Sequence, residues 1–535
     1  MSRRKMGTSK KYIPFWIGLA MGAGVFLGSK LNFQDQSDTL FSSNVKKEKL
    51  NRLIDYIDYE YVDEINTDSI VDVTVNRILE NLDPHSVYIS PEELEGVTES
   101  MQGDFIGIGV SYYPYRDTIS VINTIKGGPS EKSGIKAGDR ILMADQDTLF
   151  GENLLRDELA GKLKGALNSQ VQLKVFRKGK GVFDVVVKRG KVPIKSVDAS
   201  YMLTDKIGYI KINRFAETTY KEFKKSLNVL LKAEMSELVL DLRDNGGGFI
   251  TPALRIADEF LEEETLIMFT KNKKGAVEKN YATGRGSFQE GKISVLINEN
   301  SASASEILAG AIQDNDRGTI IGRRSYGKGL VQREMSLGDG SAVRLTISRY
   351  YTPTGRSIQK PYGNGNKAYF NEYLERYKNG ELQSVDSIQV ADSLKFKTPK
   401  GTIVYGGGGI IPDHFVAKDS TRVGETLNYM LRSGFIGRYV FEALDEKRAT
   451  YNKLSLSEFK NSTIVDDEFV DGFLLFARRR DIQMNASEFA EPLKRYLKAT
   501  MAEQLFGTNV FEKILNKNDA MIERVLTLSH NDQKE

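Results

Sequence analysis

Residues 206–322 alternate between short apolar segments and amphipathic ones, and this alternation limits the fold more than any other feature of the chain. The segments KIGYIKI, ELVLDL, KISVLIN and GTIIG predict strands. Helices between them are predicted by TPALRIADEFLE, by SEILAGAIQD and by the helical face of Tyr220, Phe223, Leu227, Leu230 and Leu231. Strands that alternate with helices are typical of an α/β layer with largely parallel strands. We therefore expect a mixed α/β core over residues 191–416, inside a 535-residue chain that is too long for one domain.

Short strands and glycine turns precede this core, from residue 103 to residue 190. FIGIG at 105–109 is followed by GPSEKSGIKAGDRI at 128–141, and residues 171–190 predict a hairpin around 178–181. Glycines let backbone N–H groups converge on a terminal carboxylate, and an extended peptide can add to a sheet edge. Residues 103–190 therefore resemble a PDZ domain, although a glycine-rich hairpin alone is the simpler alternative. The resemblance implies peptide-binding roles for Phe105, Gly107, Ile108 and Gly109.

Helical patterns flank both regions. Residues 45–102 predict helices interrupted by LDPHSVYISPEEL at 82–94, where Ser90 is expected as N-cap and Pro91 as the first helical residue. From residue 417 to 535 glycine becomes sparse and leucines recur at helical spacing, which predicts a helical domain. Core packing is its default explanation, and a homo-oligomer or adaptor surface is the alternative. Residues 363–400 are polar and suggest an insertion of unknown role.

The first 44 residues predict a membrane anchor and a linker. Residues 1–11 carry five basic residues and no acid, and residues 12–29 contain no charge. An 18-residue helix would span about 27 Å, close to the hydrocarbon thickness of a bilayer. A cleaved signal peptide and a buried soluble helix are the alternatives. With the basic end in the cytoplasm and a polar linker at 30–44, we expect a single-pass protein of the bacterial inner membrane, its catalytic part periplasmic or extracellular.

Composition excludes several kinds of chemistry. The chain has no cysteine, which removes disulfides and thiol catalysis, and its three histidines make a histidine-rich metal site unexpected. Beyond the basic residues of the first eleven, the chain has 70 basic and 72 acidic residues. A nearly neutral body gives no electrostatic reason to expect nucleic-acid binding.

A lysine between two glycines lies in IGRRSYGKGL at 321–330, where residues 322–328 fit the start of a phosphate-binding loop. Such a loop needs Ser or Thr after the lysine and a helix that follows. Gly329 occupies the Ser/Thr position, and the next residues alternate like strands. We therefore expect no nucleotide at Lys328.

Three serines lie where a predicted strand gives way to a helix, in INENSASASEILAGAIQDNDRG at 297–318. A serine at a helix N-terminus is exposed and faces N–H groups that favour developing negative charge, although capping alone is an alternative role. No histidine lies in the α/β region before His414, so a histidine base has little support. A lysine can act as the base when burial keeps its amine neutral. Lys328 is the candidate, with an ordinary surface lysine as the alternative.

Taken together, these motifs resemble the carboxyl-terminal processing (tail-specific) proteases, over residues 45–416 and in family order. The resemblance rests on SASAS, GKG and the PDZ segment, and also on LVLDLRDNGGG, YYTPTGRSIQ and GGGGIIPD. It implies a multidomain α/β (α+β) fold whose protease core is of the ClpP/crotonase-like type.

The same resemblance implies site residues. Ser303 would be the nucleophile, Lys328 the general base and Gln332 the residue that orients the lysine. The oxyanion hole would consist of the backbone amides of Ala304 and Gly247, with Gly246 and Gly248 as alternatives. The family commonly has proline or serine where this chain has Gly246, which leaves the choice among the three glycines open.

The expected function is that of a membrane-anchored serine endopeptidase. Its PDZ domain would capture accessible C-terminal tails of proteins or peptides, and cleavage would pass through an acyl-enzyme without a metal or organic cofactor. Tail binding could also complete the alignment of the two catalytic side chains, which is a hypothesis. A non-catalytic PDZ scaffold with a retained protease fold is the alternative function, and a histidine-dependent PDZ protease is a weaker one.

Overall fold

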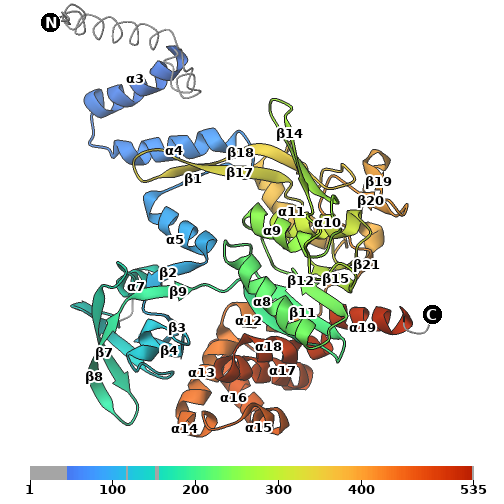
Figure 1. The fold of residues 1–535 in the computed structure, drawn as a ribbon. Coiled ribbons are helices and arrows are strands. Elements are labelled where there is room, and N and C mark those ends of the chain that lie inside the picture. Colours follow the sequence, from blue (N-terminus) through green and yellow to red (C-terminus); the bar gives the residue numbers. More distant parts are fainter. Residues whose placement is uncertain (1–44, 116–117, 151–155, 533–535) are drawn as a thin grey trace, which may run out of the picture. The chain divides into compact units, whose positions relative to one another are not determined.

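The structure is a computed structural model, and it describes residues 45–115, 118–150 and 156–532. The chain divides into two compact units, one ending at Ile78 and the other starting at Leu79. Figure 1 shows the elements coloured along the chain.

The described part of the first unit consists of α3 (Val45–Glu60) and most of α4 (Thr67–Glu80). A helix is confirmed in α3, where Leu50, Leu53, Ile54 and Ile57 form an apolar stripe. The stripe is not buried, because Leu50 and Leu53 remain 39% and 54% exposed. The stripe therefore forms no hydrophobic core among the described residues of this unit.

The predicted placement in the membrane is corrected. Within residues 45–115, 118–150 and 156–532, no helix is long and apolar enough to cross a bilayer. The physical reason is charge: the longest described helix, α17 (Ala486–Phe506), has 21 residues, and six of them are charged. The expectation of a single-pass inner-membrane protein is therefore not supported. The anchor expected at residues 12–29, with its flanks at 1–11 and 30–44, lies outside the described residues.

A six-stranded sheet forms the centre of the second unit, in the order β10-β11-β12-β15-β16-β21. The four pairings from β11 to β21 are parallel and only β10 is antiparallel, which confirms the predicted α/β layer. The elements of this layer are β10 (Val197–Met202), β11 (Ile207–Ile212), α8 (Thr219–Lys232), β12 (Glu237–Asp241), α9 (Ile250–Asp258), β15 (Lys292–Ile297), α10 (Ala304–Asp314), β16 (Thr319–Gly322) and β21 (His414–Phe415).

Both faces of this sheet are covered. Leu238 and Leu240 of β12 face the core that α8, α9 and α10 form, whereas Val239 faces the opposite side. There it packs with Met521 and Ile522 of α19 (Ala520–Asp532). Side chains of a strand alternate between the two faces, so an apolar run such as ELVL fits a strand buried on both sides.

A second, antiparallel sheet lies beside the first and has the order β1-β18-β13-β14, with β17 also paired to β18. β1 pairs with the start of β18, Ile89 opposite Ala342, and this pairing brings residues 82–90 to the second sheet. The strands are β1 (Val87–Ile89), β13 (Leu266–Asn272), β14 (Val277–Tyr281), β17 (Leu330–Ser336) and β18 (Ala342–Tyr351).

The expected insertion at 363–400 contains regular structure. It begins with a helix, and a small two-stranded sheet follows it. Its elements and those next to it are α11 (Asn366–Lys378), η2 (Val385–Ser387), η3 (Asp392–Leu394), β19 (Lys395–Lys397) and β20 (Ile403–Tyr405).

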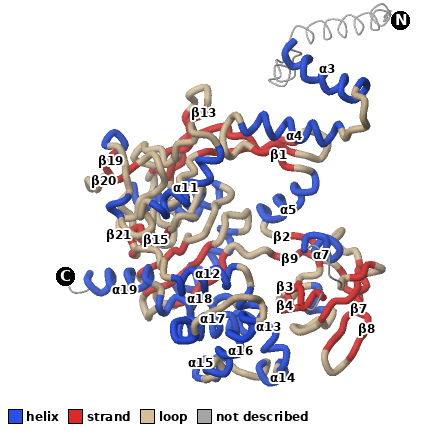
Figure 2. Tube along the Cα trace, turned by 180° about the vertical axis from the view of Figure 1, so that it is seen from behind, coloured by secondary structure: helices blue, strands red, loops and turns tan. Residues whose placement is uncertain are grey.

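The PDZ-like region follows α5 (Pro91–Gln102), whose N-cap is Ser90 as predicted. Its main sheet has the order β3-β4-β5-β7-β8, so β3 is an end strand, and β7 and β8 form the expected hairpin (Figure 2). Its elements are β2 (Asp104–Gly107), β3 (Val110–Tyr115), β4 (Thr118–Thr124), α6 (Pro129–Lys132), β5 (Arg140–Ala144), β6 (Asp147–Thr148), α7 (Arg156–Leu163), β7 (Gln170–Arg177), β8 (Gly181–Lys188) and β9 (Gly190–Pro193).

Helices make up the C-terminal region, as predicted. Leu493, Leu497 and Met501 of α17 lie in one hydrophobic core with residues of α12, α13 and α16, which confirms core packing as their role. The elements are α12 (Arg422–Arg432), α13 (Phe435–Glu446), α14 (Arg448–Tyr451), α15 (Leu456–Asn461), α16 (Asp467–Arg478), α17, α18 (Thr508–Leu515), η4 (Asn516–Asn518) and α19.

Candidate active site

The three predicted serines lie at the carboxyl ends of β12 and β15, where the loops after parallel strands meet. The outer two are fully buried and join these loops. Ser301 Oγ donates to the carbonyl of Leu242 at 2.8 Å, and Ser305 Oγ donates to the carbonyl of Asn245 at 2.9 Å. Ser303, between them, is only partly buried. The middle serine is therefore the one with a hydroxyl in reach of a substrate.

Ser303 has a strained backbone. It is the N-cap of α10 and has φ 55° and ψ −113°, a region that L-residues rarely adopt. Such strain typically costs about 1–3 kcal/mol and tends to occur at functional sites. A sharp strand-to-helix turn also exposes the nucleophilic serine of α/β-hydrolases. The predicted junction of strand and helix at this serine is therefore present.

A buried carboxylate connects Ser303 to the predicted base. Glu306 Oε2 accepts the backbone N–H of Ser303 at 2.8 Å and that of Lys328 at 2.9 Å. Its Oε1 accepts the N–H of Gly327 at 2.7 Å and the hydroxyl of Ser325 at 2.5 Å. Burial raises the pKa of this carboxyl group, and the four donors oppose the shift. Glu306 was not among the predicted site residues. Its position three residues after Ser303 fits a capping box, and this pattern could have indicated its contact with the Ser303 backbone.

Lys328 lies in the loop between β16 and β17. A strand follows it, as predicted, whereas a phosphate-binding loop would be followed by a helix. Its amine donates to Gln332 Oε1 at 3.0 Å. Burial lowers the pKa of Lys328, and the positive charge of Arg344 adds to this effect. Among the described residues, no hydrogen bond joins the Lys328 amine to the Ser303 hydroxyl. The structure thus brings the two backbones to one carboxylate without joining the two side chains.

Gln332 is held in turn by the loop that contains LDPHS. Its Nε2 donates to the backbone carbonyl of His85. Asp83 Oδ1 shapes this loop by accepting the N–H of His85 at 2.8 Å and that of Ser86 at 3.0 Å, and it also accepts the hydroxyl of Thr346 in β18 at 3.1 Å. The motif was recognised in the sequence, but its place beside Gln332 depends on the pairing of β1 with β18.

The predicted oxyanion residues lie next to Ser303. A Cβ added at Gly247, which has φ 98°, would come within 2.7 Å of Ser303 Cβ, whereas Gly246 has nothing within 4 Å and Gly248 packs against Phe215. The geometry thus favours Gly247 among the three glycines. Its N–H is engaged, since it donates to Asn245 Oδ1 at 2.9 Å. Ala304 begins α10, so its amide has no carbonyl four residues back within the helix.

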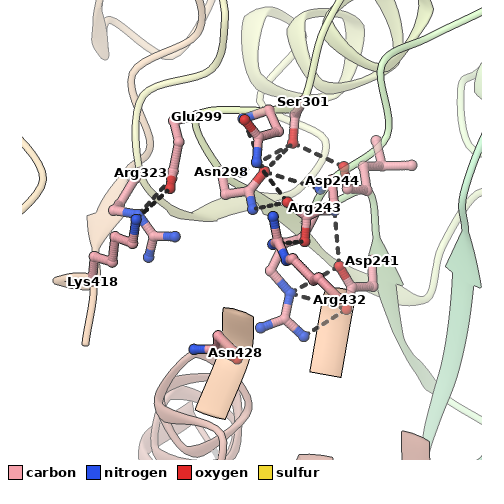
Figure 3. A network of polar contacts seen from close by, with 12 residues as sticks. Asp241, Arg243, Asp244, Asn298, Glu299, Ser301, Arg323, Lys418, Asn428 and Arg432 are labelled. Atoms are coloured by element: carbon pink, nitrogen blue, oxygen red, sulfur yellow. Dashed lines mark hydrogen bonds and ion pairs between the residues drawn. The ribbon is translucent and has the colours of Figure 1, made fainter. Parts of the chain in front are cut away.

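Polar contacts join the loops after β12 and β15 to the C-terminal helices (Figure 3). Asp244 and Asn298 exchange two hydrogen bonds of 3.0 Å, which connect the loop after β12 to the loop after β15. Arg432 of α12 donates to Asp244 at 2.9 Å, and Arg243 bridges to Asp519 at 2.7 Å. The C-terminal region therefore contacts the strand ends that carry the glycines and the serines.

The predicted peptide-binding loop lies at the start of β3. Phe105 and Gly107 belong to β2 and pair with β9. Ile108 is buried in the core of the PDZ-like region, and Gly109 has φ 73°, which favours glycine. None of these residues contacts Ser303 in the structure. In residues 45–115, 118–150 and 156–532, no group of three or more His, Asp or Glu side chains could hold a metal ion.

Comparisons with protein families match three parts of the chain. Residues 206–364 match peptidase family S41, and residues 106–197 match the PDZ domain. Residues 426–507 match a family of unknown function. The first match contains Ser303 and Lys328, the predicted catalytic dyad. The second contains Gly107, Ile108 and Gly109 of the predicted peptide-binding loop.

Curated relatives extend the similarity over most of the chain. A carboxy-terminal-processing protease of Bartonella bacilliformis is 34% identical over 345 residues, 63% of this chain and 79% of its own length. A probable CtpA-like serine protease of Staphylococcus aureus strain N315 is 32% identical over 378 residues, 70% of this chain and 73% of its own length. Among solved structures, the photosystem II D1 C-terminal processing protease is 27% identical, with 58% of this chain and 83% of that chain covered and a TM-score of 0.35.

Proposed function

Because the chain belongs to the carboxy-terminal processing proteases of peptidase family S41, we propose that it cleaves peptide bonds with Ser303 as nucleophile and Lys328 as general base. The chain is a C-terminal processing serine protease with a PDZ domain. The proposal concerns the roles of Ser303 and Lys328 and the acyl-enzyme mechanism.

One observation supports the dyad most directly. The amides of Ser303 and Lys328 donate to the same oxygen of Glu306, at 2.8 and 2.9 Å. Two residues that are 25 positions apart are thereby held side by side. The nucleophile has a strained backbone, and the pKa of the lysine is lowered by burial. A Ser–Lys mechanism requires these properties, because only a neutral amine can accept the serine proton.

The proposed reaction has two stages. Neutral Lys328 takes the proton of Ser303 Oγ while the oxygen bonds to the scissile carbonyl carbon, and the carbonyl π-electrons move to its oxygen. The amides of Ala304 and Gly247 would donate to that oxyanion. The C–N bond then breaks, the lysine returns its proton to the leaving amine, and an acyl-enzyme remains. A water molecule, deprotonated by the same lysine, hydrolyses this ester.

Two features suggest that the described state is not the reactive one. The Gly247 amide donates to Asn245, and among the described residues no hydrogen bond joins the Lys328 amine, which donates to Gln332, to the Ser303 hydroxyl. The Gly247 amide would have to turn toward the substrate, and the amine would have to reach the Ser303 hydroxyl while it keeps its bond to Gln332. A glycine at φ 98° and an unbranched lysine side chain can rotate with little steric hindrance.

We also propose that the PDZ domain binds the C-terminal tail of a protein substrate and that tail binding aligns the dyad. β3 is an end strand, so its outer edge can accept an extended peptide, and the loop of Ile108 and Gly109 precedes it. The test is the labelling of Ser303 by an acylating probe with and without a tail peptide. Identical rates and identical pH profiles would rule out this alignment.

The decisive experiment for the dyad uses the full chain and a protein substrate with an unstructured apolar C-terminal tail. Wild type is expected to cleave it, whereas Ser303→Ala and Lys328→Ala are not. Lys367→Ala, which removes an exposed lysine of α11, is the matched control and should retain activity. Intact-mass analysis after acid quench should reveal the acyl-enzyme in wild type. Cleavage at the wild-type rate by both dyad variants would refute the assignment.

A further inference from the structure

The helix α11 begins directly after the matched S41 region, which ends at residue 364. It holds Tyr369 against residues 323–329, the loop between β16 and β17 that contains Lys328 and is called the base loop below. Tyr369 is 2% exposed, and besides its interaction with Tyr326 its hydroxyl has two hydrogen-bond partners. One is His85 Nε2 at 2.7 Å, and the other is Gln359 Nε2 at 3.4 Å. A buried hydroxyl with two such partners is a fixed point in the structure.

Each partner leads to a different side of Lys328. On one side, Gln359 Oε1 accepts the N–H of Gly329, the residue after the lysine, at 2.8 Å. On the other side, the carbonyl of His85 accepts from Gln332, whose Oε1 accepts the Lys328 amine at 3.0 Å. These hydrogen bonds form a closed circuit that starts at the Lys328 amine and returns to the backbone after Lys328. Tyr369 lies midway along this circuit.

The protonation state of His85 fits this circuit. Burial lowers its pKa to about 4, with Lys328 adding to the effect. Asp83, Lys328 and Lys360 are the charged groups that face the imidazole. A neutral imidazole has one acceptor nitrogen. The Tyr369 O–H can therefore donate to Nε2 while its oxygen accepts from Gln359, and each group has a compatible role.

A second contact fixes α11 to the same loop. Arg376, 4% exposed, donates to the carbonyls of Arg324 and Ser325 at 2.6 and 3.2 Å and pairs with Glu381 at 2.7 Å. Tyr369 and Arg376 are seven residues apart, two turns of helix, and so lie on one face of α11. This face of α11 therefore contacts Arg324 and Ser325 directly and reaches Gly329 through Gln359.

We propose that Tyr369 is a positioning residue for the general base: through His85 and Gln359 it holds Gln332 and the backbone after Lys328, so that the amine stays dry and correctly aimed. The proposal rests on the proposed function of Lys328. It assigns to α11, outside the matched S41 region, a task in the reaction. Without the Tyr369 hydroxyl, water can reach the amine, and the pKa of Lys328 returns toward its ordinary value.

The test compares Tyr369→Phe with Tyr377→Phe, a matched change on the same helix whose side chain is 43% exposed. For Tyr369→Phe we expect about a tenfold lower kcat at neutral pH and an unchanged KM. The acid limb of the pH–kcat profile should move up by about one unit, which corresponds to that factor. Tyr377→Phe should match wild type. A merely structural defect would lower activity without moving the acid limb.

A double-variant cycle shows whether Tyr369 acts through Gln332. In the Gln332→Ala background, Tyr369→Phe should cause little further loss of kcat. A full tenfold loss in that background, or a wild-type acid limb for the single variant, would overturn the proposal. If Tyr369→Phe does not fold, as judged by circular dichroism, Gln359→Ala removes the other arm of the circuit and must give the same upward shift. Lys328→Ala in the same series separates the two hypotheses, because full activity there refutes the dyad itself.

Discussion

Replacing Glu306 with glutamine is expected to impair turnover more than stability, because one carboxylate holds the backbones of both proposed catalytic residues. Glu306 is fully buried and accepts four hydrogen bonds. A glutamine has almost the same shape but only one acceptor oxygen. That oxygen can keep the N–H groups of Ser303 and Lys328, and the amide nitrogen can donate to the Ser325 hydroxyl. The N–H of Gly327 then has no acceptor.

The magnitude follows from this unsatisfied donor, and the Ser325 hydroxyl, which already accepts the N–H of Ile410 at 2.7 Å, also loses its acceptor. A buried N–H without a partner costs about 1–3 kcal/mol. The three remaining bonds weaken when the charge is lost, and the removal of a buried charge offsets this. Because Gly327 precedes Lys328, the strain falls on the proposed base, and about 1–3 kcal/mol corresponds to a loss of about 5- to 160-fold in kcat. Relief of the strain by a shift of the loop would leave global stability only slightly reduced.

The variant also changes how stability depends on pH. Burial raises the pKa of Glu306 above its unfolded value, so the native state binds a proton more tightly. Its contribution to stability is therefore present at low pH and declines as pH rises from the ordinary carboxyl pKa through the raised one. Glu306→Gln should lack this slope in urea titrations between these two pKa values.

The assay pairs initial rates on a fluorogenic peptide with urea unfolding of the same preparations. Glu259→Gln is the matched control, since Glu259 is 3% exposed and lies outside the proposed dyad. Its carboxylate accepts hydrogen bonds from the Tyr220 hydroxyl and the Lys224 amine. It should lose stability and keep kcat. Wild-type kcat in Glu306→Gln, whatever its stability, would refute the reasoning, because the shared carboxylate would then support the fold alone.

Three further predictions follow from the same site. Gly247→Ala should inactivate the enzyme while it stays folded, because φ 98° disfavours a side chain and the new Cβ would lie 2.7 Å from Ser303 Cβ; residual probe labelling of Ser303 above about a tenth of wild type would contradict this. The acid limb of kcat/KM should lie below the ordinary lysine pKa, because burial lowers the pKa of Lys328 and the neutral fraction rises with pH; a limb at the ordinary value would count against Lys328 as base. In nitrogen-15 NMR spectra His85 should stay neutral down to its pKa of about 4, and titration near pH 6.5 would contradict its buried position.

Much of the fold could be predicted because local patterns and packing agree. β11, β12, β15 and β16 begin and end within one residue of the predicted segments, since each is a compact apolar run bounded by polar residues or glycine. The cover on the second face could not be predicted. Met521 and Ile522 pack on strands that lie more than 200 residues earlier in the chain, and no local pattern encodes that contact.

The same division holds for the candidate site. Ser303 and Lys328 could be proposed because residue type and neighbouring glycines restrict what they can do, and the family resemblance supplied their roles. Glu306 was missed although its spacing from Ser303 fits a capping box. His85 and Tyr369 could not be proposed, since each is ordinary in its own segment. Their contacts depend on the pairing of β1 with β18 and on the docking of α11, which are long-range events.

The late position of α19 has a consequence for how the enzyme is made. Its Met521, Ile522 and Val525 close the second face of the sheet whose other face supports α10 and Ser303. During translation at about 5–20 residues per second, Ser303 is synthesised roughly 10 to 45 s before α19. During that interval the proposed nucleophile lies on a layer that still exposes apolar surface. The sheet can therefore be covered on both faces only after the C-terminal segment has been synthesised. This order of synthesis delays proteolysis by a nascent chain.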